Sequence, residues 1–158
     1  MPRITPNLWF DTESEDAAEF YVSIFPNSKV TNVSRYAEGG YREAGSVMTV
    51  DFTLDGQDYT AINGGPQFPQ TEAISLLINC ADQAEVDYYW DALSKDGEEG
   101  QCGWLKDKFG VSWQVVPPGM EEVLGGSDPE RSKRAMAAML TMKKLDLAAL
   151  LAAADGTG

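Results

Sequence analysis

Any chemistry that this chain performs must use carboxylates, tyrosines, lysines, cysteines, hydroxyls or amides, because the sequence contains no histidine. Both a histidine-ligated metal site and a histidine general base are therefore excluded. Asp51 is the acid whose position points most to function, since it lies in the middle of an alternating segment, on its polar side. We expect Asp51 to be either a proton carrier or a solvated acid at the edge of a strand. A tyrosine is the alternative proton carrier, and we assign no other catalytic residue.

Neutral hydrogen-bonding residues lie on the polar sides of three predicted strands. Thr49 accompanies Asp51 on the first of these strands, Ser75 lies on the second and Gln114 on the third. The aromatic residues near them are Tyr59, Trp104 and Trp113. Amides and hydroxyls beside aromatic rings suit a small polar or aromatic ligand, so these residues are candidates for lining a pocket. Alternatively, the same residues face solvent or a second copy of the chain.

Composition excludes several classes of partner. The 158 residues include 12 Lys and Arg against 25 Asp and Glu, which gives a net charge of −13. Nucleic-acid binding needs clustered basic surface and is not expected. No apolar run approaches the ~18 residues of a membrane span, and the first residues lack the layout of a signal peptide. With only Cys80 and Cys102, no disulfide framework is expected, so we predict a cytoplasmic protein with reduced thiols.

Hydrophobic periodicity predicts alternating strands and helices along most of the chain. The predicted strands are residues 4–10, 29–37, 46–54, 58–63, 73–80, 101–107 and 111–116, and the predicted helices are 12–25, one opening at 82, 119–124, 129–142 and 145–154. Asp55-Gly56 predicts a type I′ hairpin. Asp128 before Pro129 and Asp146 are predicted N-caps of the last two helices.

The order of elements restarts after about 70 residues. Thr12 and Asp82 are candidate N-caps 70 positions apart, and each is followed three residues later by a glutamate, Glu15 or Glu85. This spacing predicts an internal repeat in which each copy begins strand, helix, strand. The alternative is a coincidence between two ordinary strand–helix units.

Several strings carry a resemblance to a known family: ITPNLWFD, AAEFYVSIFPNSKV, AINGGPQF, EVDYYWDALS, QCGWLKDKFGVSWQVVP and, near the end, SKRAMAAMLTMKKLDLAAL. Together they resemble the PhnB-like branch of the vicinal oxygen chelate superfamily, the glyoxalase/bleomycin-resistance fold, a branch labelled 3-demethylubiquinone-9 3-methyltransferase. The resemblance implies an α+β fold of two tandem βαβββ modules around a concave pocket, and a homodimer. We expect one PhnB-like domain over 1–158, with modules at 4–66 and 73–118, the second compressed, and C-terminal helices over 119–158.

The resemblance also implies where a metal ion would be held in active members, which use His and Glu side chains on four strands. The second of these positions falls near Asn63 and the third on Ser75. The last, in a D-x-x-G-x-x-x-E pattern that begins at Asp107, falls on Gln114. The first position is not fixed. Neutral side chains do not by themselves hold Zn²⁺, Ni²⁺ or Fe²⁺, so we predict no metal and no cofactor.

The methyltransferase label has no support in the motifs. A cofactor such as S-adenosylmethionine is usually held by a glycine-rich loop between a strand and a helix. Glycine pairs occur here at 39–40, 64–65 and 125–126, and none opens a helix in that setting.

These observations favour metal-free binding of a small molecule in a cleft between the two modules. Two alternatives stay open. One is an enzyme: a lyase, an isomerase or the methyltransferase of the family label. The other is an interaction protein that uses the methionine-rich C-terminal helices, where Met136, Met139, Leu140 and Met142 cluster.

Overall fold

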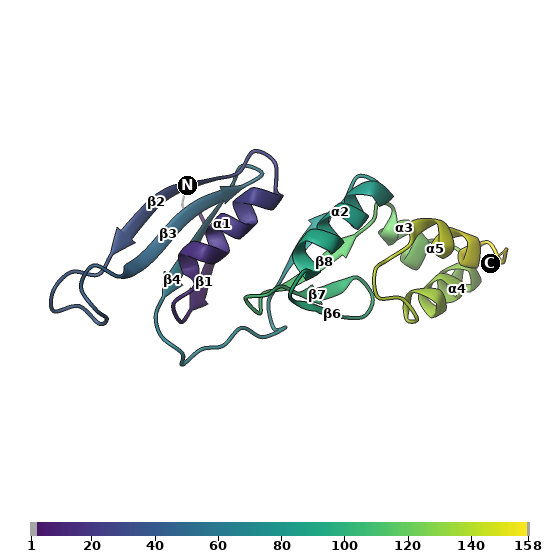
Figure 1. Cartoon of the computed structure of the whole chain (residues 1–158). Coiled ribbons are helices and arrows are strands. Elements are labelled where there is room, and N and C mark those ends of the chain that lie inside the picture. The colour runs from purple at the N-terminus through teal and green to yellow at the C-terminus, as the bar shows by residue number, and fades with distance from the viewer. Residues whose placement is uncertain (1–2, 158) are drawn as a thin grey trace. The chain divides into compact units, whose positions relative to one another are not determined.

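A computed structural model describes residues 3–157 of the chain (Figure 1), and shows a mixed α+β protein with two four-stranded sheets and five helices over that range. The chain folds as two compact units that divide between Gln70 and Thr71. The two sheets lie one in each unit, within the predicted segments 4–66 and 73–118.

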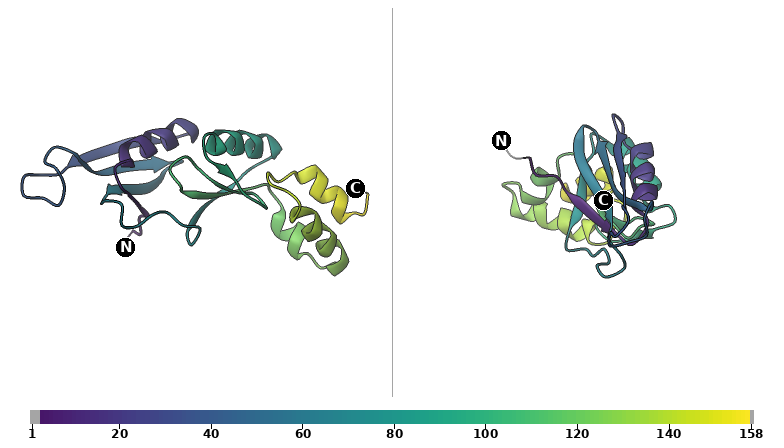
Figure 2. Two further views of the ribbon diagram at one scale, coloured as in Figure 1. Left: turned by 60° about the horizontal axis from the view of Figure 1, so that its bottom comes forward. Right: turned by 90° about the vertical axis from the view of Figure 1, so that its left-hand side faces the viewer.

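The first unit is a βαβββ module. Its elements are β1 (Asn7–Phe10), α1 (Ser14–Ile24), β2 (Lys29–Arg35), β3 (Val47–Leu54) and β4 (Gln57–Asn63). The strand order is β1-β4-β3-β2, with β1 parallel to β4 and the other neighbours antiparallel. Helix α1 packs across one face of this sheet (Figures 1 and 2).

The core of the first unit follows from the alternation along β3. Val50, Phe52 and Leu54 are buried, and the Phe52 ring lies 6.3 Å from that of Tyr21 on α1. The residues between them on β3 point to the other face of the sheet, because successive side chains in a strand alternate. The predicted type I′ turn is confirmed, since Asp55 and Gly56 both have positive φ, at 46° and 80°.

The second unit repeats this topology with shorter strands. Its elements are β5 (Ser75–Asn79), α2 (Gln83–Ser94), β6 (Glu98–Glu99), β7 (Trp104–Lys106) and β8 (Ser112–Val116). The strand order β5-β8-β7-β6 matches that of the first sheet, and β5 is again parallel to β8. The predicted repeat is therefore confirmed. Strand β6 was not predicted, because two residues are too few to show an alternating pattern.

Of the two N-caps predicted from the repeat, Asp82 and Thr12, only Asp82 is confirmed. Asp82 caps α2 as predicted, accepting a hydrogen bond of 2.9 Å from the Glu85 amide. The prediction for Thr12 is wrong: α1 has Glu13 at its N-cap, and no side chain at that position caps it. Instead, the Ser14 amide donates to Asn63 Oδ1 at 2.9 Å.

Three further helices belong to the second unit: α3 (Met120–Gly125), α4 (Pro129–Met139) and α5 (Leu147–Ala154). Asp128 and Asp146 cap α4 and α5 as predicted. Met120, Leu145 and Leu150 form a buried cluster between them. The Gln83 side chain, at the start of α2, bonds to the segment at the start of α5. It donates to the Leu145 carbonyl at 3.0 Å and accepts from the Leu147 amide at 2.8 Å.

The methionine-rich segment packs only in part within this unit, because Met136 and Leu140 are exposed. Met139 and Met142 pack against the buried cluster, and the Met142 carbonyl accepts from the Cys102 amide at 2.8 Å. Helix α4 ends at Met139, earlier than predicted, so Leu140 and Met142 lie in the turn that follows. Within residues 3–157, no helix has the length and apolarity to cross a membrane.

Candidate functional site

Each sheet has a helix on one face, and several predicted site residues lie on the other, which we call the uncovered face. On the first sheet Thr49 and Asp51 occupy this face. The Thr60 hydroxyl donates to Asp51 Oδ1 at 2.8 Å, and the hydroxyls of Thr49 and Ser34 are hydrogen-bonded to each other. Asp51 is therefore hydrogen-bonded across two strands, and is half-buried rather than fully solvated.

On the second sheet, Ser75 and Gln114 meet although they are far apart in sequence. Strands β5 and β8 are parallel neighbours, and Gln114 Nε2 donates to Ser75 Oγ at 2.9 Å. Trp104 pairs directly with Gln114 across β7 and β8, so its side chain is on the same face. Three of the predicted pocket residues thus lie together on the uncovered face of the second sheet.

A small cavity of about 200 Å³ opens beside these residues. Trp104, Lys106 and Ser112 line it from β7 and β8. Ser112 is only 1% exposed, and its hydroxyl has no hydrogen-bond partner among the described residues. Ser112 was not among the predicted pocket residues. The signal that would find it is parity, because it lies two residues before Gln114 and so on the same side of β8.

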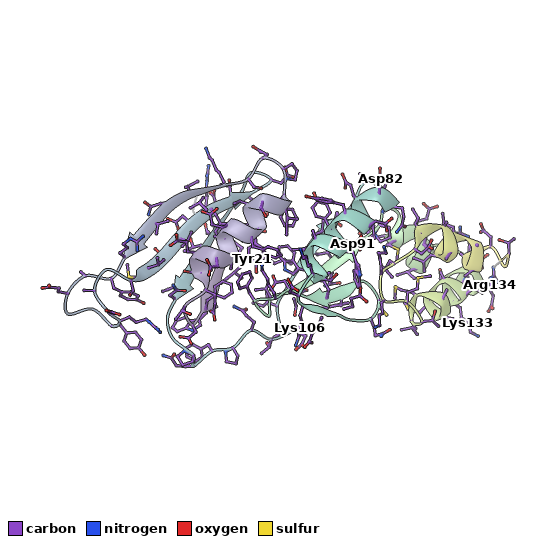
Figure 3. The ribbon with its side chains drawn as sticks, viewed as in Figure 1. Tyr21, Asp82, Asp91, Lys106, Lys133 and Arg134 are labelled. Atoms are coloured by element: carbon purple, nitrogen blue, oxygen red, sulfur yellow. The ribbon has the colours of Figure 1, made fainter. Side chains whose placement is uncertain are left out.

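Lys106 is the one basic residue among those that line this cavity (Figure 3). Its ammonium pairs with the Glu72 carboxylate. This hydrogen-bonded ion pair lowers the pKa of Glu72 and raises the pKa of Lys106. Glu98 and Glu99 also line the cavity, which therefore offers a cation paired with one acid, two further acids, an indole and an unpaired hydroxyl.

Three predicted pocket residues point to the helix-covered faces instead. Tyr59 stacks on Phe52 at 5.5 Å between ring centroids, and burial raises the pKa of its hydroxyl. Trp113 is 2% exposed, and its indole Nε1 donates to Asp107 Oδ2 at 2.8 Å. Asn63 lies at the end of β4 in the same row as buried Ala61. These side chains build the cores of the two units.

The donor set does not fit a divalent transition metal. Ser75 and Gln114 are neutral and hydrogen-bond each other, and the Asn63 amide is used by Ser14 and by the Val47 carbonyl. Across the part of the chain that the structure describes, no group of three His, Cys, Asp or Glu side chains is placed to hold a metal ion. Zn²⁺ and its neighbours require imidazole, thiolate or carboxylate ligands, so we derive no chemistry from a metal here.

The strand–helix connections do not fit an adenosyl cofactor either. The chain passes from β1 to α1 through residues 11–13 and from β5 to α2 through 80–82, and neither connection contains glycine. The connection from β8 to α3, residues 117–119, contains a single glycine, Gly119, and so is no glycine-rich loop. Gly64 follows β4 rather than preceding a helix, and a Cβ there would collide with the Trp9 ring. Glycine at position 64 therefore leaves room for the Trp9 ring and does not mark a cofactor loop.

The Cys80 thiol offers no nucleophile at this site. Cys80 is buried, and burial, with the nearby Glu85 carboxylate as a smaller cause, raises its pKa to about 11. A thiol with that pKa is almost entirely protonated at neutral pH and is a poor nucleophile.

Comparison with known proteins gives a consistent result. Residues 2–116 match the family described as 3-demethylubiquinone-9 3-methyltransferase. A PhnB protein from Bacillus cereus with the same description is 35% identical, with a TM-score of 0.67, and the match covers 73% of this chain and 99% of that one. No curated protein matches the chain. Helices α3–α5 lie beyond the residues that match the family.

More distant structures share the fold alone. A Pseudomonas aeruginosa protein is 19% identical with a TM-score of 0.62, covering 74% of this chain and 98% of that one. The fosfomycin resistance protein FosX of Listeria monocytogenes, solved with Mn(II) and sulfate, is 14% identical with a TM-score of 0.53, covering 77% of this chain and 93% of that one.

Proposed function

We propose that this chain, which belongs to the 3-demethylubiquinone-9 3-methyltransferase family, binds a small polar organic molecule without a metal ion. This family is a PhnB-like branch of the vicinal oxygen chelate superfamily. The binding site we propose is the cavity in the second unit that is lined by Trp104, Lys106 and Ser112. We call it the β8 pocket. The predicted cleft between the modules stays a prediction.

The observation that carries this proposal is the Ser112 hydroxyl. Buried polar groups in folded proteins almost always have a hydrogen-bond partner, and leaving one without a partner costs about 1–3 kcal/mol. Ser112 lines the cavity, and its Oγ is buried without a partner among the described residues. A ligand that carries one hydrogen-bonding group would satisfy it, and the Trp104 indole supplies an apolar surface for the rest of that ligand.

Binding fits these residues better than catalysis does. Ser75 and Gln114 occupy positions where the resemblance places chelating side chains, and they hydrogen-bond each other. Asp51 lies in the first sheet, away from the β8 pocket, and is hydrogen-bonded there to Thr60. A role as proton carrier in a lyase or isomerase would require Asp51 to exchange that partner for a substrate. We therefore keep Asp51 as the candidate only for the enzyme alternative.

The proposal includes a cytoplasmic homodimer, as the family resemblance implies. Two large apolar side chains favour an interface with a second copy of the chain. Ile74, just before β5, is 74% exposed, and Leu77 on β5 is 50% exposed. Sedimentation velocity would give the mass of a dimer, and Leu77→Lys should shift the distribution toward monomer. A monomer at all concentrations would contradict this part of the proposal.

The β8 pocket is tested by fragment screening of the full chain after treatment with EDTA. Small polar aromatic compounds are added to ¹⁵N-labelled protein, and the reporters are the Trp104 indole N–H and the Gln114 side-chain amide. We expect at least one compound to shift both signals saturably. Ser112→Ala should weaken that compound by about tenfold, because it removes one hydrogen bond of about 1.4 kcal/mol.

Ser23→Ala is the matched control, because Ser23 lies on α1 and its hydroxyl bonds only to the Phe20 carbonyl in the same helix. It should leave the affinity unchanged. The proposal fails if no compound shifts the reporters, or if Ser112→Ala and Ser23→Ala bind equally well.

A further inference from the structure

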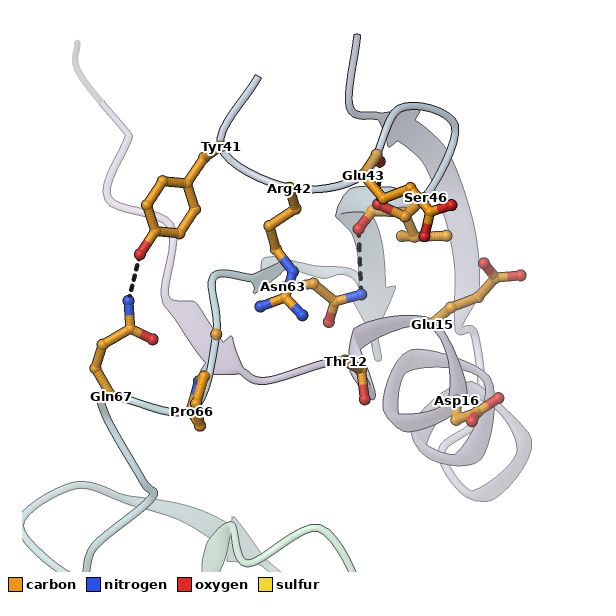
Figure 4. Close-up of a pocket in the computed structure, with 12 residues that line it drawn as sticks. Thr12, Glu15, Asp16, Tyr41, Arg42, Glu43, Ser46, Asn63, Pro66 and Gln67 are labelled. Atoms are coloured by element: carbon orange, nitrogen blue, oxygen red, sulfur yellow. Dashed lines mark hydrogen bonds between the residues drawn. The ribbon is translucent and has the colours of Figure 1, made fainter. Parts of the chain in front are cut away.

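The first unit contains a second and larger cleft, of about 1120 Å³ (Figure 4). It is built from the start of α1, the loop that joins β2 to β3 and the segment that follows β4. Of the residues predicted from the sequence to line a pocket, it contains Asn63 alone. It shares no lining residue with the β8 pocket.

Asn63 makes the floor of this cleft rigid, because it bonds to three segments. Its Oδ1 accepts from the Ser14 amide at 2.9 Å, and its Nδ2 donates to the Val47 carbonyl at 3.2 Å. Its backbone carbonyl accepts from the Tyr36 hydroxyl at 2.6 Å. One wall is closed by a hydrogen bond of 2.8 Å from Gln67 Nε2 to the Tyr41 hydroxyl.

Arg42 brings the one positive charge among the side chains that line the cleft, and its guanidinium points toward Asn63 (Figure 4). A single nitrogen, Nη1, contacts Asp11 Oδ1, at 3.4 Å. Within residues 3–157 the other guanidinium N–H groups have no protein partner. An arginine with a free edge is suited to binding a carboxylate through two parallel hydrogen bonds.

Three carboxylates also line the cleft, and they set the charge of the ligand it would accept. Glu15 and Asp16 come from the first turn of α1, and Glu43 comes from the β2–β3 loop. These three acids outnumber the guanidinium, so a ligand with negative charge alone, such as phosphate, would be repelled. A ligand with more cationic than anionic groups would be attracted at both ends.

We infer that this cleft binds a small organic molecule with two cationic groups and one carboxylate, the charge pattern of a basic amino acid. The carboxylate binds the free edge of Arg42, and the cationic groups lie toward Glu15, Asp16 and Glu43. Nothing in this arrangement requires the β8 pocket, so the two sites can be tested separately.

The test uses three probes on the full ¹⁵N-labelled chain: L-arginine, agmatine, which lacks the carboxylate, and glutarate, which lacks the cations. The reporters are the Asn63 side-chain amide and the Gly65 backbone amide. We expect L-arginine to bind saturably and about tenfold more tightly than agmatine, since one charge-assisted contact is lost. Glutarate should not bind.

Variants then separate the two ends of the ligand. Arg42→Gln should reduce L-arginine binding to the level of agmatine or below it and should not weaken agmatine, because the cleft loses a positive charge. Glu15→Gln with Glu43→Gln should weaken both cationic probes, and Glu130→Gln, an exposed acid on α4, should weaken neither. The inference is overturned if glutarate binds as well as L-arginine, if Arg42→Gln changes nothing, or if no probe shifts these two amides.

Discussion

The two modules share one strand order but fix the starts of their helices differently. In the second module, α2 is capped by Asp82, the residue immediately before it. In the first, the Ser14 amide at the start of α1 is bonded by Asn63, which is 49 residues further along the chain. A local cap can be recognised from a short pattern, whereas a cap from another strand requires the fold itself. The comparison explains why Asp82 was predicted correctly and Thr12 was not.

The modules also differ in the length of their strands. The antiparallel strands of the first sheet have seven or eight residues, whereas β6, β7 and β8 have two to five. The second module bonds to the segment between α4 and α5, whose Met142 and Lys143 carbonyls accept from the Cys102 and Gly103 amides, and it contains a buried acid, Asp107. That carboxylate accepts from the amides of Phe109 and Val111 and from the Trp113 indole. We therefore expect the second unit to depend on Asp107 and on the C-terminal helices.

The largest effect is expected for Asp107→Ala. It would leave three buried or half-buried N–H groups without their acceptor, and we expect the free energy of unfolding to fall by about 4 kcal/mol. Urea unfolding of the full chain measures this loss. Asp91→Ala, an exposed acid on α2, is the control and should cost less than about 0.5 kcal/mol. Similar losses for the two variants would show that Asp107 does not support the second module.

Leu145→Ala tests the contribution of the C-terminal helices. Leu145 is 2% exposed and packs with Met120 and Leu150, so the truncation should cost about 3 kcal/mol. Leu151→Ala makes the same change at a residue on α5 that is 36% exposed, and should cost about 1 kcal/mol or less. If both variants unfold at the same urea concentration, α3–α5 do not stabilise the second unit.

Asn63→Ala tests the non-local cap in the first module. It removes the acceptor for Ser14 and the donor to Val47, so we expect a loss of about 2 kcal/mol. Asn63→Asp keeps the acceptor and should lose less. Hydrogen exchange at the Ser14 amide should accelerate in Asn63→Ala only. Equal exchange in both variants would mean that the Asn63 side chain does not cap α1.

The smallest effect is expected at the exposed pair of Glu72 and Lys106. Their hydrogen bond lowers the pKa of Glu72 below 4.5, so any stability it supplies is present above that pH and is lost as the pH falls through the lowered value. Carbon-13 NMR titration of the Glu72 carboxyl should show the low midpoint, and Lys106→Met should restore the ordinary one. An unchanged midpoint would show that the pair does not persist in solution.

Periodicity and parity predicted much of the fold. The face of β3 that carries Val50 and Phe52, the hairpin at Asp55 and the strand repeat all follow from local alternation and turn chemistry. The site was predicted less completely. Parity placed Ser75 and Gln114 on the uncovered face, and it also places Ser112 on the same side of β8 as Gln114. Trp104, Tyr59 and Trp113 were chosen as nearby aromatic residues, and two of them, Tyr59 and Trp113, pack under a helix. The Arg42 cleft depends on which segments meet in three dimensions, which no short pattern records.

The central claim is that the β8 pocket works without a metal ion. The most direct measurement compares the affinity of one fragment, selected by its shift of the Trp104 indole, in EDTA and in excess Mn²⁺. We predict dissociation constants within about twofold of each other, because the acids that line the pocket, like all others in the part of the chain that the structure describes, form no group of three placed to hold a metal ion. Binding that appears only with Mn²⁺, or that tightens by about tenfold, would contradict the claim.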